Sequence, residues 1–370
     1  MLQGIKEMRR FLTFGTMSGN SFGKSLVLTT YGESHGDQIG GILDGVPAGI
    51  ALDIVAVQHA LDRRRPGQST LTTQRDESDV VRFHSGLFEG KTTGTPIGFS
   101  ILNKDQQSAD YDALKKVLRP SHADFTYAAK YGHRDHRGGG RASARETATR
   151  VVAGAIAAQI IPDVHVVAYT SAVGSISLDK HWEQLDLSKI DGHPTRCPDP
   201  EMAEEMSRYI NFVREEQDST GGVVSVVTSG VPAGWGEPVF DKLQADLGKA
   251  LFSINAVKGV EIGSGFRGAQ MRGSQHNDSI NKDFSTATNN AGGIVGGISN
   301  GAAITARVAF KPVATIGQKQ KTATTSGKET TLAAAGRHDP CVVPRAVPIV
   351  EAMVYLVLAD HYLRNLKHTI

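Results

Sequence analysis

Two long segments that are apolar on every side restrict the fold of this chain more than any other feature. One begins at Ala142 and runs to Pro162, with TATRVVAGAIAAQII at its centre, and the other spans residues 344–366. A helix without a polar face is buried on all sides. The longest apolar runs, residues 151–161 (interrupted by Gln159) and 354–359, fall short of the roughly 18 residues that cross a bilayer. We therefore expect a soluble protein in which two central helices are covered by sheet on both faces.

Strand-like and helix-like segments flank these two helices. Residues 25–31 (SLVLTTY) are rich in β-branched side chains, and a second strand is expected over residues 40–46. A helix begins near Asp53, a plausible N-cap, and stops at Pro66 and Gly67. The pattern predicts an α+β fold, completed by short strands within 80–102, a helix at 201–216, a strand at 223–229 and a helix at 241–254.

One internal repeat divides the chain into halves. The pentapeptide GVPAG at residues 45–49 recurs at 230–234, 185 residues later. Each copy follows an apolar strand and precedes an amphipathic helix that starts near an aspartate, Asp53 or Asp241. Five identical residues can arise by chance, but the shared strand–turn–helix context favours two pseudo-symmetric halves. Since no linker-like segment separates them, the halves are expected to share one core.

Charge and cysteine content exclude several classes of protein. Forty basic residues face 38 acidic ones, for a net charge of +2, which argues against a global polyanion-binding surface. Cys197 and Cys341 form neither a CxxC pair nor a disulfide framework, which favours a reducing cytoplasm. Glycine is in excess, with 41 of 370 residues, about 11% against a usual value of about 7%. These glycines are expected in turns and where backbone approaches a ligand.

Two phosphate-binding fingerprints fail on inspection. Residues 18–25 (SGNSFGKS) nearly match a P-loop, but Ser18 replaces the first glycine and no strand precedes it. Residues 263–268 (GSGFRG) match GxGxxG after a strand-like segment, but a breaker-rich loop follows where a helix is required. Neither a nucleotide-hydrolysing P-loop nor a Rossmann site is expected.

The strongest local signal is the segment RDHRGGGRASARETATR at residues 134–150. Three glycines allow close backbone approach, and Ser143 with Glu146 reads as a capping box that opens a helix. Amides at a helix N-terminus attract phosphate. A solvated basic helix start and an RNA-binding RGG segment are the alternatives, but we favour a phosphate or flavin-phosphate site. Four arginines gather there: Arg134, Arg137, Arg141 and Arg145.

Candidate acid–base residues lie in three further segments. His35 stands between glycines in GESHG directly after a strand, and His122 lies in the polar loop that leads to the arginine-rich segment. Asp339 in GRHDP precedes the second buried helix and is a candidate base. The three arginines at 63–65 end a helix, where they also complement its dipole. No metal-ligand spacing is present, so no metal is expected.

Together these segments resemble the chorismate synthase family from about Met17 to the end of the chain. The resemblance rests on GESHG with GGILDGVPAG, on HALDRRRPGQS, and on RPSHADFTYAAKYGHRDHRGGGRASARET. It continues through NNAGGIVGGISNG, KPVATI and GRHDPCVVPRAVPIVEAM. Residues 1–16 lie outside it and are expected to be tag-like or disordered, so residues 17–370 form the single family domain.

The resemblance implies a β-α-β sandwich with a helical layer between two antiparallel sheets, assembled as a homotetramer. It implies the last step of the shikimate pathway, 1,4-elimination of phosphate from 5-enolpyruvylshikimate 3-phosphate to give chorismate. Reduced FMN is required without net redox change. In the family's usual account, the flavin lends electron density as the C–O bond breaks, and its N5 takes the C6 proton.

The same resemblance implies roles for individual residues. His35 would protonate the leaving phosphate, His122 would set the protonation state of the reduced flavin, and Asp339 would relay a proton from flavin N5. Substrate or NADPH would contact Ser34, Arg64 and Arg145. FMN would be held by Arg141, Ala142, Ser143, Asn255, Ala256, Gly296, Lys311, Pro312, Val313, Ala314, Thr315 and Arg337.

Two departures and one alternative qualify this reading. Thr70 stands where many bacterial relatives have an arginine, and Arg75 is a possible substitute. Val313 and Ala314 replace two hydroxyl residues of the usual KPTSSI motif, so Thr315 and backbone groups would have to satisfy the flavin. The chain lacks the insertions of the longer fungal type, so we expect the monofunctional form, supplied by an external flavin reductase that uses NADPH. The competing class is a non-catalytic flavin-storage or RNA-binding protein that uses the same basic loop, although neither nucleic acid nor membrane is expected as a partner.

Overall fold

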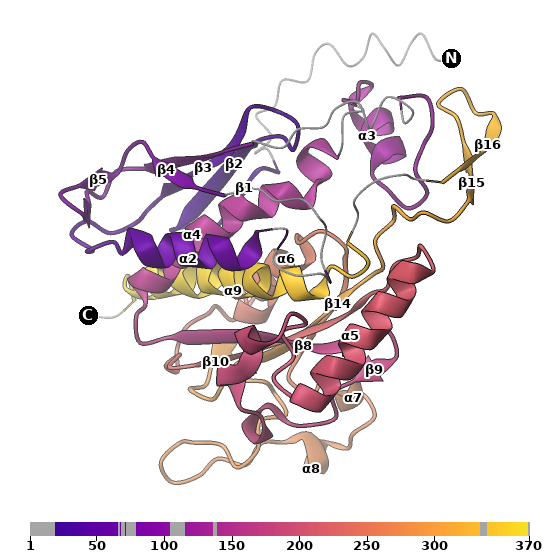
Figure 1. Cartoon of the computed structure of the whole chain (residues 1–370). Coiled ribbons are helices and arrows are strands. Elements are labelled where there is room, and N and C mark those ends of the chain that lie inside the picture. The colour runs from indigo at the N-terminus through magenta and orange to yellow at the C-terminus, as the bar shows by residue number, and fades with distance from the viewer. Residues whose placement is uncertain are drawn as a thin grey trace, which may run out of the picture.

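The structure is a computed structural model that describes residues 19–65, 67, 71, 79–103, 115–135, 139–333 and 339–368. Two five-stranded antiparallel sheets lie on either side of a set of long helices (Figure 1). The predicted α+β class with antiparallel sheets is confirmed. The expectations for residues 1–16 lie outside the described residues.

The first sheet comes from the N-terminal part of the chain. Its strand order is β1-β2-β3-β7-β4, and all neighbouring strands are antiparallel. The two strands expected at 25–31 and 40–46 are confirmed as β2 and β3. The bounds are β1 Ser21–Phe22, β2 Val27–Gly32, β3 Gln38–Asp44, β4 Val81–Phe83 and β7 Ile97–Leu102, with a small β5–β6 hairpin at Leu87–Phe88 and Lys91–Thr92.

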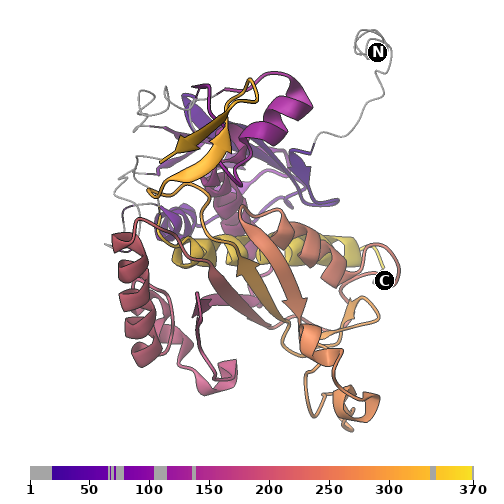
Figure 2. The same cartoon turned by 90° about the vertical axis from the view of Figure 1, so that its right-hand side faces the viewer.

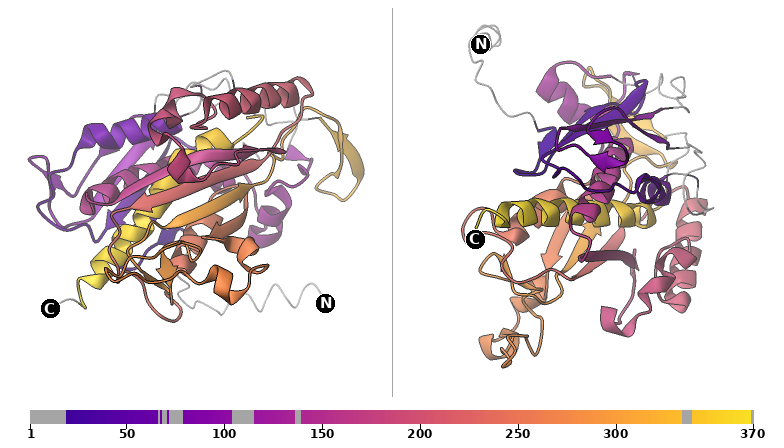
Figure 3. Two further views of the ribbon diagram at one scale, coloured as in Figure 1. Left: turned by 90° about the horizontal axis from the view of Figure 1, so that it is seen from below. Right: turned by 90° about the vertical axis from the view of Figure 1, so that its left-hand side faces the viewer.

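The second sheet has the order β11-β14-β10-β8-β9, again with antiparallel neighbours. Helix α5 (Pro200–Glu215) packs on β8 and β9 at one end of this sheet (Figure 3). The bounds are β8 His165–Val173, β9 Ile176–Ser177, β10 Gly222–Ser229, β11 Val257–Ile262 and β14 Thr305–Phe310. Two hairpins stand apart, β12 Ile294–Val295 with β13 Ile298–Ser299, and β15 Gln320–Ala323 with β16 Glu329–Leu332.

Helices α4 (Thr147–Ile160) and α9 (Val343–Asn365) are the two apolar segments, and they pack on each other. α4 contacts β2 and β3 of the first sheet, whereas α9 contacts β8 and β10 of the second. A Cβ atom at Gly154 would lie 2.5 Å from the Cα of Ala352, so the two helices approach as closely as glycine allows. α2 (Ile54–Arg64) and α6 (Leu243–Phe252) complete the layer. The remaining helices are α3 Asp124–Tyr131, α7 Gly265–Gly268 and α8 Gly273–His276, with 3-10 turns η2 Gly140–Ala142, η3 Ala144–Glu146, η4 Trp182–Gln184 and η5 Leu187–Gly192.

The sequence of α9 is long and apolar enough to resemble a membrane-spanning helix. By length and composition it could cross a bilayer, but 78% of its most apolar 18-residue window is buried inside the protein. Such burial is that of a core helix.

The two sheets are built by the same succession of elements. The chain runs β2-β3-α2-β4-β7-α4 in the first half and β8-β10-α6-β11-β14-α9 in the second, and the strands take equivalent places in each sheet. Both GVPAG turns begin with a glycine in the left-handed region, Gly45 at φ 86° and Gly230 at φ 80°. A Cβ at Gly45 would lie 1.8 Å from the Ser25 carbonyl oxygen, and one at Gly230 would lie 1.9 Å from that of Asp163. The repeated pentapeptide therefore has one structural cause, because only glycine fits either turn.

The start of α4 differs from the predicted capping box. Ser143 does accept a hydrogen bond from the Arg145 amide, but it caps the short η3 turn, and α4 begins only at Thr147. The carboxylate of Glu146 turns instead to Thr30 and Arg150. The capping-box prediction was wrong because Thr30, from the first sheet, and Arg150, one turn further along α4, bind the glutamate.

Candidate functional site

A cleft of about 630 Å³ opens between the end of β2, helix α3 and residues 139–141. The β15–β16 hairpin flanks this end of the molecule (Figure 2), and its Ala323 carbonyl accepts a hydrogen bond from the Leu118 amide. Residues from the loop that carries His35, from the loop that carries His122 and from the arginine-rich segment line the cleft, among them Glu33, His122 and Arg141.

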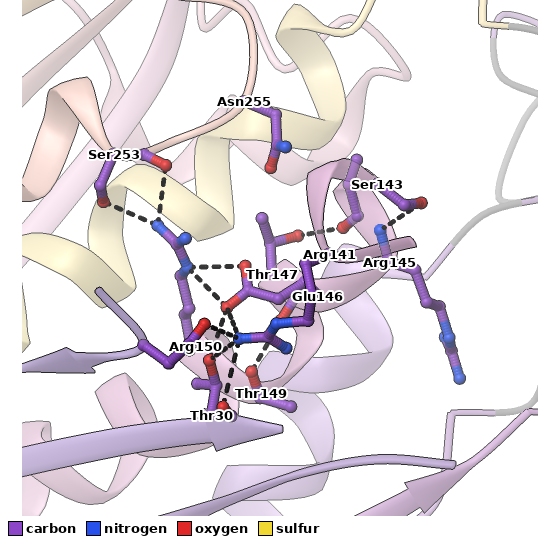
Figure 4. A network of polar contacts seen from close by, with 12 residues as sticks. Thr30, Arg141, Ser143, Arg145, Glu146, Thr147, Thr149, Arg150, Ser253 and Asn255 are labelled. Carbon is purple, nitrogen blue, oxygen red and sulfur yellow. Dashed lines mark hydrogen bonds and ion pairs between the residues drawn. The ribbon is translucent and has the colours of Figure 1, made fainter. Parts of the chain in front are cut away.

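Arg141 joins the cleft to the start of α4 (Figure 4). Its guanidinium donates to the carbonyl oxygen of Gly32 at 3.1 Å and to the hydroxyl of Thr30 at 2.5 Å. That hydroxyl donates in turn to Oε1 of Glu146 at 3.0 Å. Arg150 completes the network, because it donates to Glu146 and to the hydroxyl of Ser253. These bonds hold the arginine-rich segment against the end of β2.

Three segments of the predicted cofactor site are joined by hydrogen bonds. The side-chain Nδ2 of Asn255 donates to the Ala142 carbonyl at 2.8 Å. The Lys311 amide donates to the Ala256 carbonyl at 2.9 Å, and its Nζ donates to the Ser121 carbonyl, beside His122, at 3.3 Å. The structure therefore brings together residues that lie up to 190 positions apart in the chain.

The polar groups of this cluster suit a flavin with its phosphate. Oδ1 of Asn255 is buried and has no hydrogen-bond partner among the described residues, so it can accept from an N–H or O–H group of a ligand. Burial, together with the charge of Lys258, lowers the pKa of Lys311, and a bound anion would relieve both effects. Of the remaining predicted residues in this stretch, the Val313 carbonyl accepts a hydrogen bond from the Ser219 hydroxyl, and Thr315 is buried. Pro312 comes directly before Val313, and Ala314 lies between Val313 and Thr315.

His35 is held in a clamped loop. Its Nδ1 lies 3.1 Å from the hydroxyl of Ser34, and both side chains are buried. Nδ2 of Asn103 donates to the carbonyls of Glu33 at 2.9 Å and Gly36 at 2.7 Å, on either side of the histidine. Sequence reasoning missed Asn103, since a lone asparagine at a strand end carries no motif.

Behind this loop, Arg64 and Arg145 share the buried carboxylate of Asp79. Arg64 donates to Asp79 at 3.2 Å and to the Ala144 carbonyl at 2.6 Å, and Arg145 forms an ion pair with the other oxygen of Asp79. Nε of Arg145 donates to Oδ1 of Asn103 at 2.8 Å. The two arginines predicted to contact substrate or NADPH thus reach the His35 loop through Asn103, and their guanidinium groups bind protein acceptors here.

His122 lies beside Asp124 at the first turn of α3, with Nδ1 3.0 Å from Oδ1 of the carboxylate. Asp339 forms an ion pair with Arg345. The carbonyl of its neighbour Pro340 accepts a hydrogen bond from the Thr220 amide, and the preceding residue, Ser219, binds Val313. Asp339 therefore lies near residues 311–315.

Some predicted residues are not brought into this cluster. Gly296 lies at the turn of the β12–β13 hairpin, and the hydrogen bonds described do not join that turn to Arg141, Asn255 or Lys311. Arg337, Thr70, Arg75 and Arg137 lie outside the described residues. No group of three or more His, Cys, Asp or Glu side chains able to hold a metal ion occurs in the described ranges.

Comparisons with known proteins agree on one family. The family model described as chorismate synthase matches residues 26–363. The chain is 62% identical over 349 residues to the chorismate synthase of Christiangramia forsetii, covering 94% of this chain and 99% of that protein. It is 58% identical to that of Flavobacterium psychrophilum, covering 94% and 98%. A crystal structure of a chorismate synthase, 33% identical, superposes with a TM-score of 0.75 and 93% coverage of both chains.

Proposed function

The chain belongs to the chorismate synthase family, and on that premise we propose which of its residues hold cofactor and substrate and which move protons. The established reaction is 1,4-elimination of phosphate from 5-enolpyruvylshikimate 3-phosphate, the last step of the shikimate pathway. The protein is thus a carbon–oxygen lyase, and the alternative hypothesis of a non-catalytic flavin-storage or RNA-binding protein is not supported.

Reduced FMN, which this family uses, is proposed to bind where Arg141–Ser143, Asn255–Ala256 and Lys311–Thr315 meet. When bound, the cofactor would supply electron density for cleavage of the substrate C–O bond, with no net redox change. The unpaired Oδ1 of Asn255 would accept from the flavin, and Lys311 and Arg141 would face anionic groups. Since Val313 and Ala314 lack hydroxyls, Thr315 and main-chain groups would provide the remaining bonds. Gly296 and Arg337 stay predicted cofactor contacts.

Proton transfer is assigned to three residues. His35 would protonate the departing phosphate, and the clamp of Asn103 on its loop supports this role because a general acid must be accurately placed. His122 would exchange a proton at the flavin side of the cleft, which its side chain lines. Asp339, ion-paired with Arg345, would carry a proton away. Ser34, Arg64 and Arg145 stay predicted contacts of substrate or NADPH.

The setting of the enzyme completes the proposal. We place it in the cytoplasm as a homotetramer of the monofunctional type, which receives reduced FMN from an external flavin reductase that consumes NADPH. The equivalent element order of the two halves supports one domain of β-α-β sandwich type with internal pseudo-twofold symmetry.

The observation that carries the cofactor site is the bond from Asn255 to Ala142 beside an unpaired acceptor. Asn255→Ala removes both, and we expect the dissociation constant of reduced FMN to rise about tenfold or more, the cost of one to two hydrogen bonds. Anaerobic fluorescence titration measures this change without turnover.

Asn281→Ala, in an exposed loop, is the matched control and should bind FMN as the wild type does. Equal affinity of the Asn255→Ala and wild-type proteins would contradict the location proposed for the cofactor.

A further inference from the structure

The side chain of His122 is backed by a buried carboxylate on the side away from solvent. Its ring is 20% exposed and lines the cleft, whereas the Asp124 carboxylate is only 4% exposed. A tight turn creates this placement: Ser121 adopts φ 55°, and the His122 amide donates to the Arg119 carbonyl at 3.3 Å. The histidine can therefore meet a ligand with one nitrogen while the other stays on Asp124.

The carboxylate of Asp124 is a fixed anion. Oδ2 accepts from the main-chain amide of Arg119 at 3.1 Å and from its Nε at 2.8 Å. Oδ1 accepts from the Arg119 NH2 group at 2.9 Å and pairs with Arg134 at 2.8 Å. Burial opposes ionisation, but the hydrogen bonds from Arg119 and then His122 hold the pKa of Asp124 well below its usual range.

An ionised carboxylate can only accept hydrogen bonds, so Nδ1 of His122 must carry a proton to bind it. In the neutral ring this leaves Nε2 with the lone pair, free to take or return a proton. We propose that Asp124 is a positioning residue that fixes the Nδ1–H tautomer and the ring orientation of His122 for the lyase reaction. The inference rests on the proposed role of His122.

Arg119 and Arg134 have a defined part in this arrangement. Both arginines also pair with the Asp124 carboxylate, so its negative charge does not serve as a counter-ion for His122 alone. Its main effect on His122 is to set the tautomer and the orientation of the ring. They also anchor the carboxylate, which leaves it little freedom to turn away. The same logic fixes the tautomer of histidine in Asp-His pairs of known enzymes.

A double-mutant cycle tests whether Asp124 acts through His122. Steady-state anaerobic assays compare wild type, Asp124→Asn, His122→Ala and the double variant. We expect Asp124→Asn to lower kcat about 10²-fold or more, in the range of a lost general acid–base contribution. In the His122→Ala background the same substitution should cost less than twofold. Asp199→Asn is the control, because it removes another buried, ion-paired carboxylate, which binds Lys180 and caps α5 away from the cleft.

Solid-state ¹⁵N NMR of histidine-labelled wild-type protein gives a second measurement, which does not depend on whether the Asp124→Asn variant folds. The His122→Ala protein serves to assign the His122 signals. We expect the Nδ1–H form. An Nε2–H form, or an equal loss of kcat from Asp124→Asn in both backgrounds, overturns the inference while the role of His122 stands. A wild-type rate in His122→Ala would instead overturn the role of His122, and the inference with it.

Discussion

At the scale of single residues, the candidate site depends on polar side chains that hold the predicted acid–base groups in place. Asn103 bonds the main chain on both sides of His35, and Arg145 and Asp79 hold Asn103 from behind. Each of these bonds joins residues that are more than 40 positions apart. The loop that carries His35 is thus held by the tertiary fold.

Asn103→Ala should lower kcat about 10- to 100-fold, because removing the clamp allows His35 to shift by a fraction of an ångström or more. Steady-state kinetics with reduced FMN measure the loss, and thermal unfolding measures the accompanying change in stability.

Gln159→Ala is the matched control for Asn103→Ala. The Gln159 side chain also clamps a loop, through bonds to the amide and carbonyl of Asp53, but it lies at the far end of α4. It should reduce stability while kcat is kept. Equal kcat values for Asn103→Ala and the wild type would show that the clamp does not position His35.

At the scale of elements, α4 and α9 were predictable because all-round apolarity directly reports burial on every side. The first turn of α4 was not, since Glu146 binds Thr30 and Arg150 rather than the cap. The roles of Asn103, Asp79 and Asp124 were also hidden. Their partners depend on strand register and helix placement, which no local pattern encodes.

The same substitution, glycine to alanine, should change the stability in opposite directions at the contact between α4 and α9 and at an open position in α6. Gly154→Ala would place a Cβ 2.5 Å from the main chain of Ala352, so we expect it to lower the free energy of unfolding by about 1–3 kcal/mol. Gly248→Ala, inside α6 with nothing within 4 Å, should be neutral or stabilising by up to about 1 kcal/mol.

Urea unfolding of both variants measures the difference. A Gly154→Ala protein as stable as Gly248→Ala would mean that the two central helices are not packed as tightly as described.

At the scale of the whole molecule, both the fold class and the half-chain repeat could be predicted from the sequence. The two GVPAG turns give a structural reason for the repeat. Both turns need glycine at the same position for the same steric reason. The predicted cofactor residues illustrate both the reach and the limit of motif reasoning. Asn255, Lys311 and Ala142 do meet, whereas the Gly296 turn is not joined to them by the bonds described. The homotetramer stays a prediction.

The conversion of 5-enolpyruvylshikimate 3-phosphate to chorismate with reduced FMN is what this protein is expected to perform above all. The most direct test is an anaerobic assay of purified protein with chemically reduced FMN, in which chorismate and inorganic phosphate are both quantified. We expect equal amounts of the two products with reduced FMN and none with oxidised FMN. Turnover with oxidised FMN alone, or no phosphate release with reduced FMN, would contradict this expectation.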